Sequence, residues 1–256
     1  MKNIKVRTKL TIIVALVLVL VASESFISIQ NMNQLKNKAL DTMDTSSRQN
    51  YDDSIKEQVG VVISLLSEIN NEYKAGRYSL DEAKKIAADE IRQMRYGNGG
   101  YFWVDQSDGK NIVLLGNSTE GTNRMNTKDA EGYQMVKEII RVAVQDGGGY
   151  TDYVFPKEGE TEPSPKRSYS EYFKPFDWVV GTGNYTDYID TAIAQQDEEF
   201  TSYASSKAIS LILCSVCMLI VVAILVALIA IDITKSLRKI KEQFEVIAGG
   251  NFATKM

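Results

Sequence analysis

The feature that most constrains this chain is an apolar run of 24 residues, Ala208–Ile231, which contains no charged side chain. As a helix it reaches ~36 Å at ~1.5 Å per residue, which is enough to cross a hydrocarbon core ~30 Å thick. A second apolar run occupies residues 10–29, near the N-terminus. We therefore predict two transmembrane helices, 10–29 and 208–231, that flank a segment of about 178 residues, 30–207, the size of one domain.

The first apolar run admits two interpretations. Four basic residues precede it, and Val21-Ala22-Ser23 resembles a cleavage site, so a removable signal peptide is the alternative to a retained anchor. We favour the anchor because the helical pattern continues past Ser25 through Phe26, Ile29 and Met32. Both interpretations place the following segment outside the cytoplasm.

The basic flanks of the two runs predict the orientation of the chain. Residues 1–9 hold four basic and no acidic side chains, and the second run is followed by Lys235, Arg238, Lys239 and Lys241. Positively charged flanks remain in the cytoplasm. We therefore expect a multi-pass protein of the cell membrane with an extracytoplasmic domain at residues 30–207.

Composition argues against several classes of function. Residues 30–207 hold 20 basic and 29 acidic side chains, a net charge of −9 that argues against nucleic acid and against docking on anionic lipid. The chain contains no histidine, which removes histidine-based catalysis, metal sites and pH switches. Cys214 and Cys217 lie inside the second apolar run, where we interpret them as small apolar side chains. We expect neither a metal nor a cofactor.

Two helical patterns open the outer segment. Steps of four and three separate the apolar residues Ile55, Val59, Val62, Leu66, Ile69 and Tyr73. This seam indicates either one buried helix face or a helix that continues from the first span and packs against a partner subunit. Ala75-Gly76-Arg77 ends the pattern, and Ser79 with Glu82 forms a capping box for the next helix. We expect Gly97, Gly99 and Gly100 to end that helix.

Short β patterns follow, with one further helix between them. We predict that helix at Asp129–Gln145, and a last helix from about Thr186 that leads into the second span. The order is typical of an α+β fold in which helices pack on a five-stranded antiparallel sheet. The five predicted strands are Tyr101–Asp105, Asn111–Leu115, Tyr150–Phe155, Arg167–Phe173 and Trp178–Tyr185.

The outer segment resembles a known family. Arg95–Val104, which reads RYGNGGYFWV, is similar to the start of the sheet in single Cache domains of bacterial receptors. Asp129-Ala130-Glu131-Gly132 resembles the Asp-x-x-Gly of that family, and Lys166–Tyr169 with Phe176–Tyr185 resembles its last two strands. The resemblance covers residues 32–205 and implies a PAS-like sheet combined with long N-terminal helices.

The segment after the second span, residues 232–256, resembles the first helix of a HAMP relay domain. Its apolar stripe is Ile233, Leu237, Ile240, Phe244 and Ile247, and Gly249-Gly250 is expected to end the helix. Together with the two spans and the Cache domain, it resembles the front of a methyl-accepting chemotaxis protein. That likeness implies a homodimeric transmembrane chemoreceptor input module.

The same likeness leaves the output of the chain open. A chemotaxis kinase and adaptor would be reached only through a region beyond Met256, so we expect a truncated receptor or an input stub. The alternatives are the input half of a sensor histidine kinase or a cyclase, or a non-signalling receptor stub.

The resemblance further implies a small ligand, which in this family is often an organic acid such as acetate, propionate, pyruvate or lactate. A carboxylate site needs one or two cations, hydroxyl donors and an apolar wall. Strand alternation places Tyr101 and Trp103 on one face and Phe102 on the other. The net negative charge keeps an amino acid or an amine as alternative ligands. The expected ligand-binding residues are Arg95, Tyr101, Trp103, Arg124, Tyr153, Lys166, Arg167 and Tyr169.

Two rival functions have weaker support. Gly181-Thr182-Gly183 superficially resembles a dinucleotide fingerprint, but the third glycine and the following parallel strand of that motif are absent from the pattern. A membrane-anchored enzyme without histidine would need a carboxylate, serine or lysine mechanism, and no such constellation is visible. We therefore expect a protein that is not an enzyme and has no catalytic residues.

Overall fold

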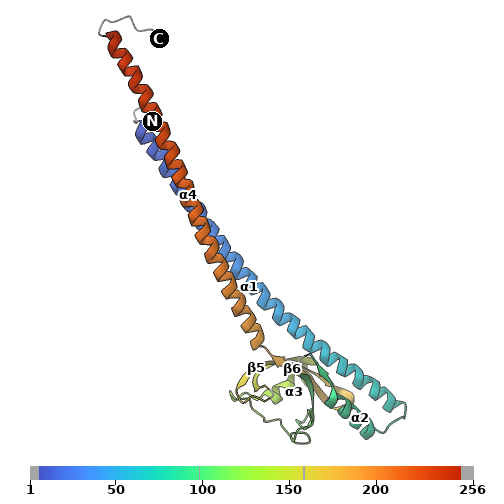
Figure 1. Ribbon diagram of the computed structural model, residues 1–256. Coiled ribbons are helices and arrows are strands. Elements are labelled where there is room, and N and C mark those ends of the chain that lie inside the picture. Colours follow the sequence, from blue (N-terminus) through green and yellow to red (C-terminus); the bar gives the residue numbers. More distant parts are fainter. Residues whose placement is uncertain (1–5, 98, 158, 249–256) are drawn as a thin grey trace. The chain divides into compact units, whose positions relative to one another are not determined.

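The computed structural model describes residues 6–97, 99–157 and 159–248. Residues Leu40–Gln195 form one compact unit, and the segments before Leu40 and after Gln195 form a second. The first of these units contains the whole sheet and is called the sensor unit below. Figure 1 shows its helices and strands in chain order.

Helix α1, Val6–Lys74, is uninterrupted over 69 residues, so the predicted continuation of the helical pattern past Ser25 is confirmed. It ends just before Gly76, whose φ of +79° is a left-handed conformation that glycine adopts without strain. Within the sensor unit, Val59, Val62 and Leu66 are fully buried in the same core as strand residues. Packing within one chain therefore accounts for the predicted seam.

Helix α2, Leu80–Gln93, begins with the predicted capping box. The Ser79 hydroxyl accepts a hydrogen bond from the Glu82 amide, and the Glu82 carboxylate accepts one from the Ser79 amide. Asp81 and Glu82 place negative charge in the first turn, where the helix dipole is positive. The helix ends at Gln93, which is earlier than the glycines that were expected to end it.

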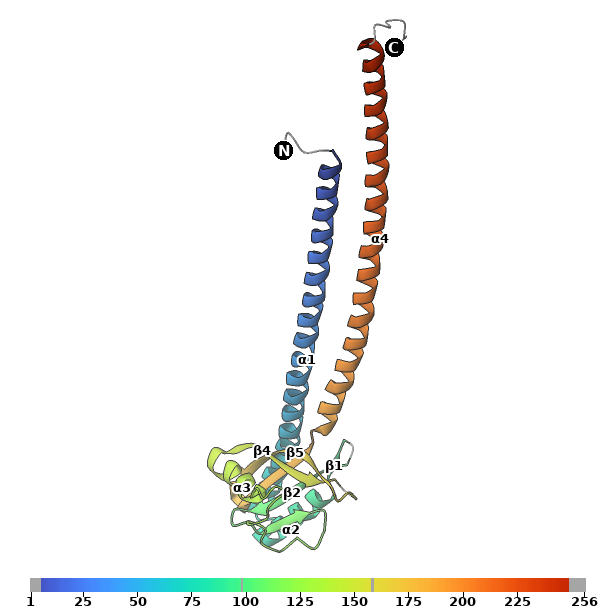
Figure 2. The same cartoon turned by 90° about the vertical axis from the view of Figure 1, so that its left-hand side faces the viewer.

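The sheet is antiparallel throughout and confirms the α+β fold, but it has six strands where the sequence predicted five. The extra strand, β1, contains only Arg95 and Tyr96, and it pairs with Tyr101 and Gly100 across a glycine-rich turn. Two residues are too few to show an alternating pattern, so this strand could not be predicted from periodicity. The order is β1-β2-β6-β5-β4, with β3 paired to β2. Figure 2 labels β1, β2, β4 and β5 in this sheet. The remaining strands are β2 Gly100–Gln106, β3 Asn111–Leu114, β4 Gly148–Pro156, β5 Pro163–Phe173 and β6 Trp178–Tyr185.

Helix α3, Met135–Asp146, starts six residues later than predicted. The Asp129 carboxylate instead accepts hydrogen bonds from the amides of Glu131 and Tyr133, and a third from Val154 on β4. This carboxylate therefore organises a turn and ties it to the sheet. The C-cap is Gly147, with a φ of +79°.

Two cores lie on opposite faces of the sheet. On one face, α1 and α2 pack on side chains that include Phe102, Val104 and Val180. On the other, α3 packs on Trp103 and Val179, with Tyr101 and Tyr153 at its margin. The predicted alternation of Tyr101 and Trp103 against Phe102 is confirmed, and both polar aromatics lie on the α3 face.

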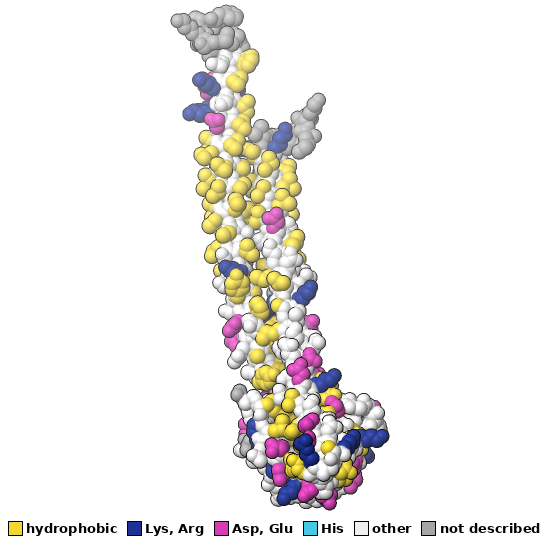
Figure 3. Space-filling view, turned by 90° about the vertical axis from the view of Figure 1, so that its right-hand side faces the viewer, with side chains coloured by type: hydrophobic (Ala, Val, Ile, Leu, Met, Phe, Trp, Pro, Cys, Tyr) yellow, Lys and Arg dark blue, Asp and Glu magenta, His cyan; other side chains and the backbone are white. Residues whose placement is uncertain are grey.

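The second unit consists of the first part of α1 and most of α4, Asp187–Ala248. The two helices contact each other through a Ser25–Ser215 hydrogen bond of 3.3 Å and a Lys36–Asp197 ion pair of 2.6 Å. Both helices are long and apolar enough to cross a membrane by length and composition. Large hydrophobic side chains are exposed along Ile12–Ile27 of α1 and along Ile209–Ile231 of α4, and Figure 3 shows hydrophobic side chains crowded on part of the two helices. The predicted helix end at Gly249-Gly250 lies outside the described residues.

Candidate ligand-binding site

Lys166, on β5, is the most unusual charged residue of the sensor unit. Only 3% of its surface is exposed, and its Nζ donates a hydrogen bond of 3.0 Å to the Tyr101 hydroxyl. Burial, together with the nearby positive charge of Arg124, lowers the pKa of Lys166 to about 7. No carboxylate among the described residues forms an ion pair with it. Four aromatic rings lie 4.8–5.7 Å from its Nζ: Tyr101, Tyr185, Phe155 and Trp103.

Arg124 reaches the same region from the loop after β3. Its Nε and Nη2 donate hydrogen bonds of 2.6 and 2.5 Å to the two carboxylate oxygens of Asp105, which is fully buried. The side-chain amide of Asn111 donates a third bond to that carboxylate, at 2.9 Å. A bidentate pair of this kind fixes the plane of the guanidinium, so Arg124 is held in a defined position.

Trp103 offers a buried donor. Among the described residues, its indole Nε1 has no hydrogen-bond partner, although the side chain is 97% buried. The ring lies against Gly181 on β6, where a Cβ atom would be 2.5 Å from the indole Cε2. The first glycine of the Gly181-Thr182-Gly183 motif thus makes room for the indole. Gly183 likewise packs closely on the β5 backbone.

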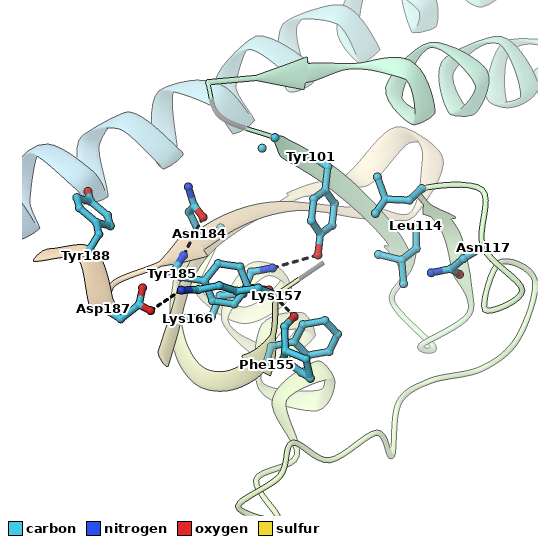
Figure 4. Close-up of a pocket in the computed structure, with 15 residues that line it drawn as sticks. Tyr101, Leu114, Asn117, Phe155, Lys157, Lys166, Asn184, Tyr185, Asp187 and Tyr188 are labelled. Atoms are coloured by element: carbon cyan, nitrogen blue, oxygen red, sulfur yellow. Dashed lines mark hydrogen bonds and ion pairs between the residues drawn. The ribbon is translucent and has the colours of Figure 1, made fainter. Parts of the chain in front are cut away.

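Two hollows lie beside Lys166, and they share Tyr101, Leu114, Phe155 and Lys166 in their linings. The inner one is a chamber of about 30 Å³, lined by residues that include Tyr101, Trp103, Arg124, Tyr153 and Lys166. The outer one is a cleft of about 680 Å³ (Figure 4). Lys166 lines both hollows.

The structure brings together five of the eight predicted ligand-binding residues, namely Tyr101, Trp103, Arg124, Tyr153 and Lys166. The other three lie elsewhere. Arg95 is exposed and donates to the carbonyl oxygens of Arg92 and Met94. Arg167 forms ion pairs of 2.6 Å with Asp52 and with Asp152, and Tyr169 packs on Tyr150 on the α1 face.

Phe155 and Tyr185 contact the Lys166 ammonium but were not among the predicted residues. Phe155 follows Tyr153 by two positions on β4, so strand alternation alone places it on the same face. Tyr185 lies beside Lys166 because the two are directly paired between β5 and β6. Such a pairing depends on strand register, which local sequence patterns do not report.

Both long helices are attached to the sheet next to Lys166. The next residue pair between β5 and β6 after Lys166 and Tyr185 is Arg167 and Asn184. The Tyr51 hydroxyl of α1 donates a 2.7 Å hydrogen bond to the Arg167 carbonyl oxygen and accepts one of 2.5 Å from the Asn184 amide. At the start of α4, Asp187 forms a 2.5 Å ion pair with Lys157 of the β4–β5 loop. The Lys166–Tyr185 pair is therefore next to the contact between α1 and the sheet and close to the start of α4.

Within the described part of the chain, the site combines a buried lysine without a carboxylate partner, an oriented guanidinium and an indole N–H without a hydrogen-bond acceptor. A charged ammonium, a guanidinium and an indole N–H can all donate hydrogen bonds, and none of them can accept one. The hydroxyls of Tyr101 and Tyr153 supply further donors, and burial raises the pKa of Tyr153 so that it stays protonated at neutral pH. The arrangement is suited to a small anion that only accepts hydrogen bonds, such as a carboxylate.

Comparison with known proteins identifies the family of the chain. A family model described as single Cache domain 2 matches residues 47–199. The methyl-accepting chemotaxis protein McpP of Pseudomonas putida is 29% identical over 177 residues, which cover 69% of this chain and 30% of that protein. The sensor histidine kinase MctS of Rhizobium johnstonii is 33% identical over 177 residues, which cover 68% and 37%. The chain thus spans about a third of the length of these relatives.

Two solved structures are also similar. A periplasmic sensor domain of a chemotaxis protein matches 55% of this chain and 96% of its own, with 30% identity and a TM-score of 0.51. A Cache chemosensory domain solved for carboxylic acid recognition matches 55% and 97%, with 27% identity and a TM-score of 0.53. Two long apolar helices and periplasmic relatives fit a membrane protein with an extracytoplasmic sensor domain. Since the family model covers more than half of its residues, the chain belongs to the single Cache domain family.

Proposed function

We propose that this chain is the input module of a transmembrane chemoreceptor whose Cache domain binds a small organic acid at Lys166. The observation that carries the proposal is a buried ammonium group without a carboxylate partner among the described residues, next to an indole N–H that also lacks a partner. Burying an unpaired charge is strongly unfavourable, and a bound carboxylate would remove that penalty. The likeness to a carboxylic-acid-binding Cache domain supports the same ligand class.

The local charges select against the alternative ligands. An amine, or the ammonium group of an amino acid, would have to approach the Arg124 guanidinium and Lys166, which is positively charged below pH 7. Among the described residues, Asp187 is the one carboxylate that lines the inner chamber or the cleft, and it is paired with Lys157. The net charge of −9 between residues 30 and 207 slows anion approach at long range, but salt screens it beyond ~8–10 Å.

Isothermal titration of the full chain in detergent micelles tests the ligand class. The panel contains acetate, propionate, pyruvate and lactate, with amino acids and amines as comparison ligands. We expect binding of at least one acid, and loss of that binding in Lys166→Met. Lys85→Met, which changes an exposed lysine of α2, is the matched control. Absence of acid binding across the panel, or an unchanged affinity in Lys166→Met, would contradict the proposal.

The proposed route of the signal is the helix that leaves the site. Ligand contact with Lys166 alters the β5–β6 pair next to Asp187, and α4 continues from there into the second apolar run. A ligand shifts such an equilibrium only by its difference in affinity for the two states. We propose a homodimer with these parts: a basic flank 1–9, a first span 10–29, a Cache domain 30–207, a second span 208–231 and a partial HAMP 232–256.

Membrane topology can be tested by labelling single cysteines in intact cells. Cys214 and Cys217 are first replaced by alanine, and exposed lysines are then changed one at a time, as Lys128→Cys and Lys241→Cys. We expect a membrane-impermeant reagent to label position 128 and to spare position 241. Labelling of both positions would place them in one compartment and refute the two-span topology.

A second output is supported by the likeness to a sensor histidine kinase. The same input module would then control a kinase, and the coding sequence after the codon for Met256 distinguishes the two. A second HAMP helix followed by long heptads would indicate a chemoreceptor.

A stub that only associates with longer receptors would co-purify with one. An anchored enzyme would show turnover, which we do not expect because the site contains donors without a nucleophile–base pair.

A further inference from the structure

The two hollows at Lys166 differ greatly in size, and this difference bears on the ligand. One water molecule needs roughly 10–15 Å³ of such space, so the inner chamber of about 30 Å³ holds about two waters. It can receive a carboxylate group but does not enclose the body of an organic acid. The outer cleft of about 680 Å³ lies within the usual range for ligand pockets, roughly 300–1,000 Å³. The body of the ligand therefore belongs in the cleft.

The walls of the cleft are largely apolar. Tyr101, Phe155 and Tyr185 surround the Lys166 ammonium at 4.8, 5.3 and 5.0 Å from their ring centres, and all three also line the cleft (Figure 4). Tyr188, at the start of α4, adds a fourth ring that is 56% exposed. A group attached directly to a carboxylate on Lys166 would therefore meet aromatic faces and edges first.

Leu115 extends the apolar wall in a strained conformation. Its φ of +58° lies in the left-handed region, which leucine rarely adopts. Glu120 holds this corner, because its Oε1 accepts hydrogen bonds from the amides of Leu114 and Gly116 at 2.7 and 2.8 Å. Strained residues persist where the surrounding structure fixes them, often at binding sites. The strain here keeps a large apolar side chain at the cleft.

We propose that the cleft selects an aromatic monocarboxylic acid, whose carboxylate binds Lys166 and whose ring packs between Tyr101, Phe155 and Tyr185. This inference rests on the proposed function and narrows it to a ligand class. A ring attached near the carboxylate gains edge-to-face contacts in addition to buried apolar area. An α-ammonium group is excluded by the two neighbouring cations, so aromatic amino acids do not fit.

Titration of the full chain in micelles with acetate and phenylacetate tests the inference, because the two acids share a carboxylate and differ by one ring. We expect phenylacetate to bind at least tenfold more tightly than acetate, from the apolar area that the ring buries. Equal or tighter binding of acetate would overturn the inference and leave the proposed function standing. Failure of phenylacetate to bind, together with binding of any other acid of the panel, would overturn the inference alone, and absence of binding by every acid would refute both.

Two variants locate the ring in the cleft. Tyr188→Ala removes an exposed ring from the cleft wall, and Tyr203→Ala removes an equally exposed tyrosine of α4 that does not line it. Leu115→Asn removes apolar surface but tolerates the left-handed backbone. We expect Tyr188→Ala and Leu115→Asn each to weaken phenylacetate binding at least threefold and to leave acetate binding unchanged. The control Tyr203→Ala should bind both acids with wild-type affinity. Unchanged phenylacetate affinity in both cleft variants would overturn the placement.

Discussion

Replacement of Lys166 by methionine should stabilise the sensor unit in the absence of ligand. The folded pKa of about 7 lies below the ordinary value of 10.5, so burial disfavours the charged form. At 1.36 kcal/mol per pKa unit, the difference amounts to about 5 kcal/mol below pH 7, where both folded and unfolded lysine are protonated. Lys166→Met also loses the ring contacts and the Tyr101 hydrogen bond, and this loss offsets about 2–3 kcal/mol of that gain in stability. The expected net gain is about 2–3 kcal/mol.

The gain should depend on pH in a defined direction. Between pH 7 and pH 10.5 the unfolded lysine holds a proton that the folded one has lost, so the stability of the wild-type protein rises with pH in that window. Lys166→Met lacks this group, so its advantage should be constant below pH 7 and shrink above it. At pH 6 the gain corresponds to roughly 4–12 °C in Tm for a unit of this size.

Tryptophan fluorescence during urea or thermal unfolding reports this unit specifically. The chain has two tryptophans, Trp103 and Trp178, and both lie in the sensor unit. Lys85→Met, an exposed control, should change stability by less than about 0.5 kcal/mol. Destabilisation by Lys166→Met at pH 6, or a difference from wild type that does not vary up to pH 10, would refute the reasoning.

Two further predictions concern the packing around the site. Tyr51→Phe leaves two partly buried backbone groups without this partner and should destabilise the sensor unit by about 1–3 kcal/mol in urea unfolding, whereas Tyr78→Phe, at an exposed tyrosine, should be neutral. A neutral Tyr51→Phe would show that the hydroxyl bridge is dispensable. Gly181→Ala places a Cβ 2.5 Å from the Trp103 indole and should cost about 1–3 kcal/mol and weaken acid binding at least tenfold in titration. The control Gly60→Ala meets no atom within 4 Å and should be neutral or slightly stabilising; wild-type affinity in Gly181→Ala would contradict the role of the indole.

Features that depend on a few adjacent residues were predictable from the sequence. The capping box needs only Ser79 and Glu82 three positions apart, and the buried face of α1 follows from apolar spacing. Strand alternation placed Tyr101 and Trp103 on one face because side chains along a strand alternate by geometry. The same rule, applied to β4, would have added Phe155.

Features that depend on distant partners were not predictable. The start of α3 was wrong because the Asp129 carboxylate is engaged by amides of its own turn and of Val154, a strand residue far along the chain. Lys166 and Arg167 are adjacent basic residues, and the residues around them do not indicate which of the two lines the binding site. One meets Asp52 on α1 and the other faces an aromatic chamber, because successive strand residues point to opposite faces.

The most direct test of the account is proton uptake when the acid binds. At pH 8 about nine-tenths of Lys166 is neutral in the free protein if its pKa is about 7, and a bound carboxylate restores the proton. Titration in two buffers of different ionisation enthalpy should show uptake of about 0.9 proton per ligand at pH 8 and almost none at pH 6. The affinity should be flat below pH 7 and fall by up to tenfold per pH unit above it. Binding that takes up no proton at pH 8 and has the same affinity from pH 6 to pH 9 would contradict the central role of Lys166.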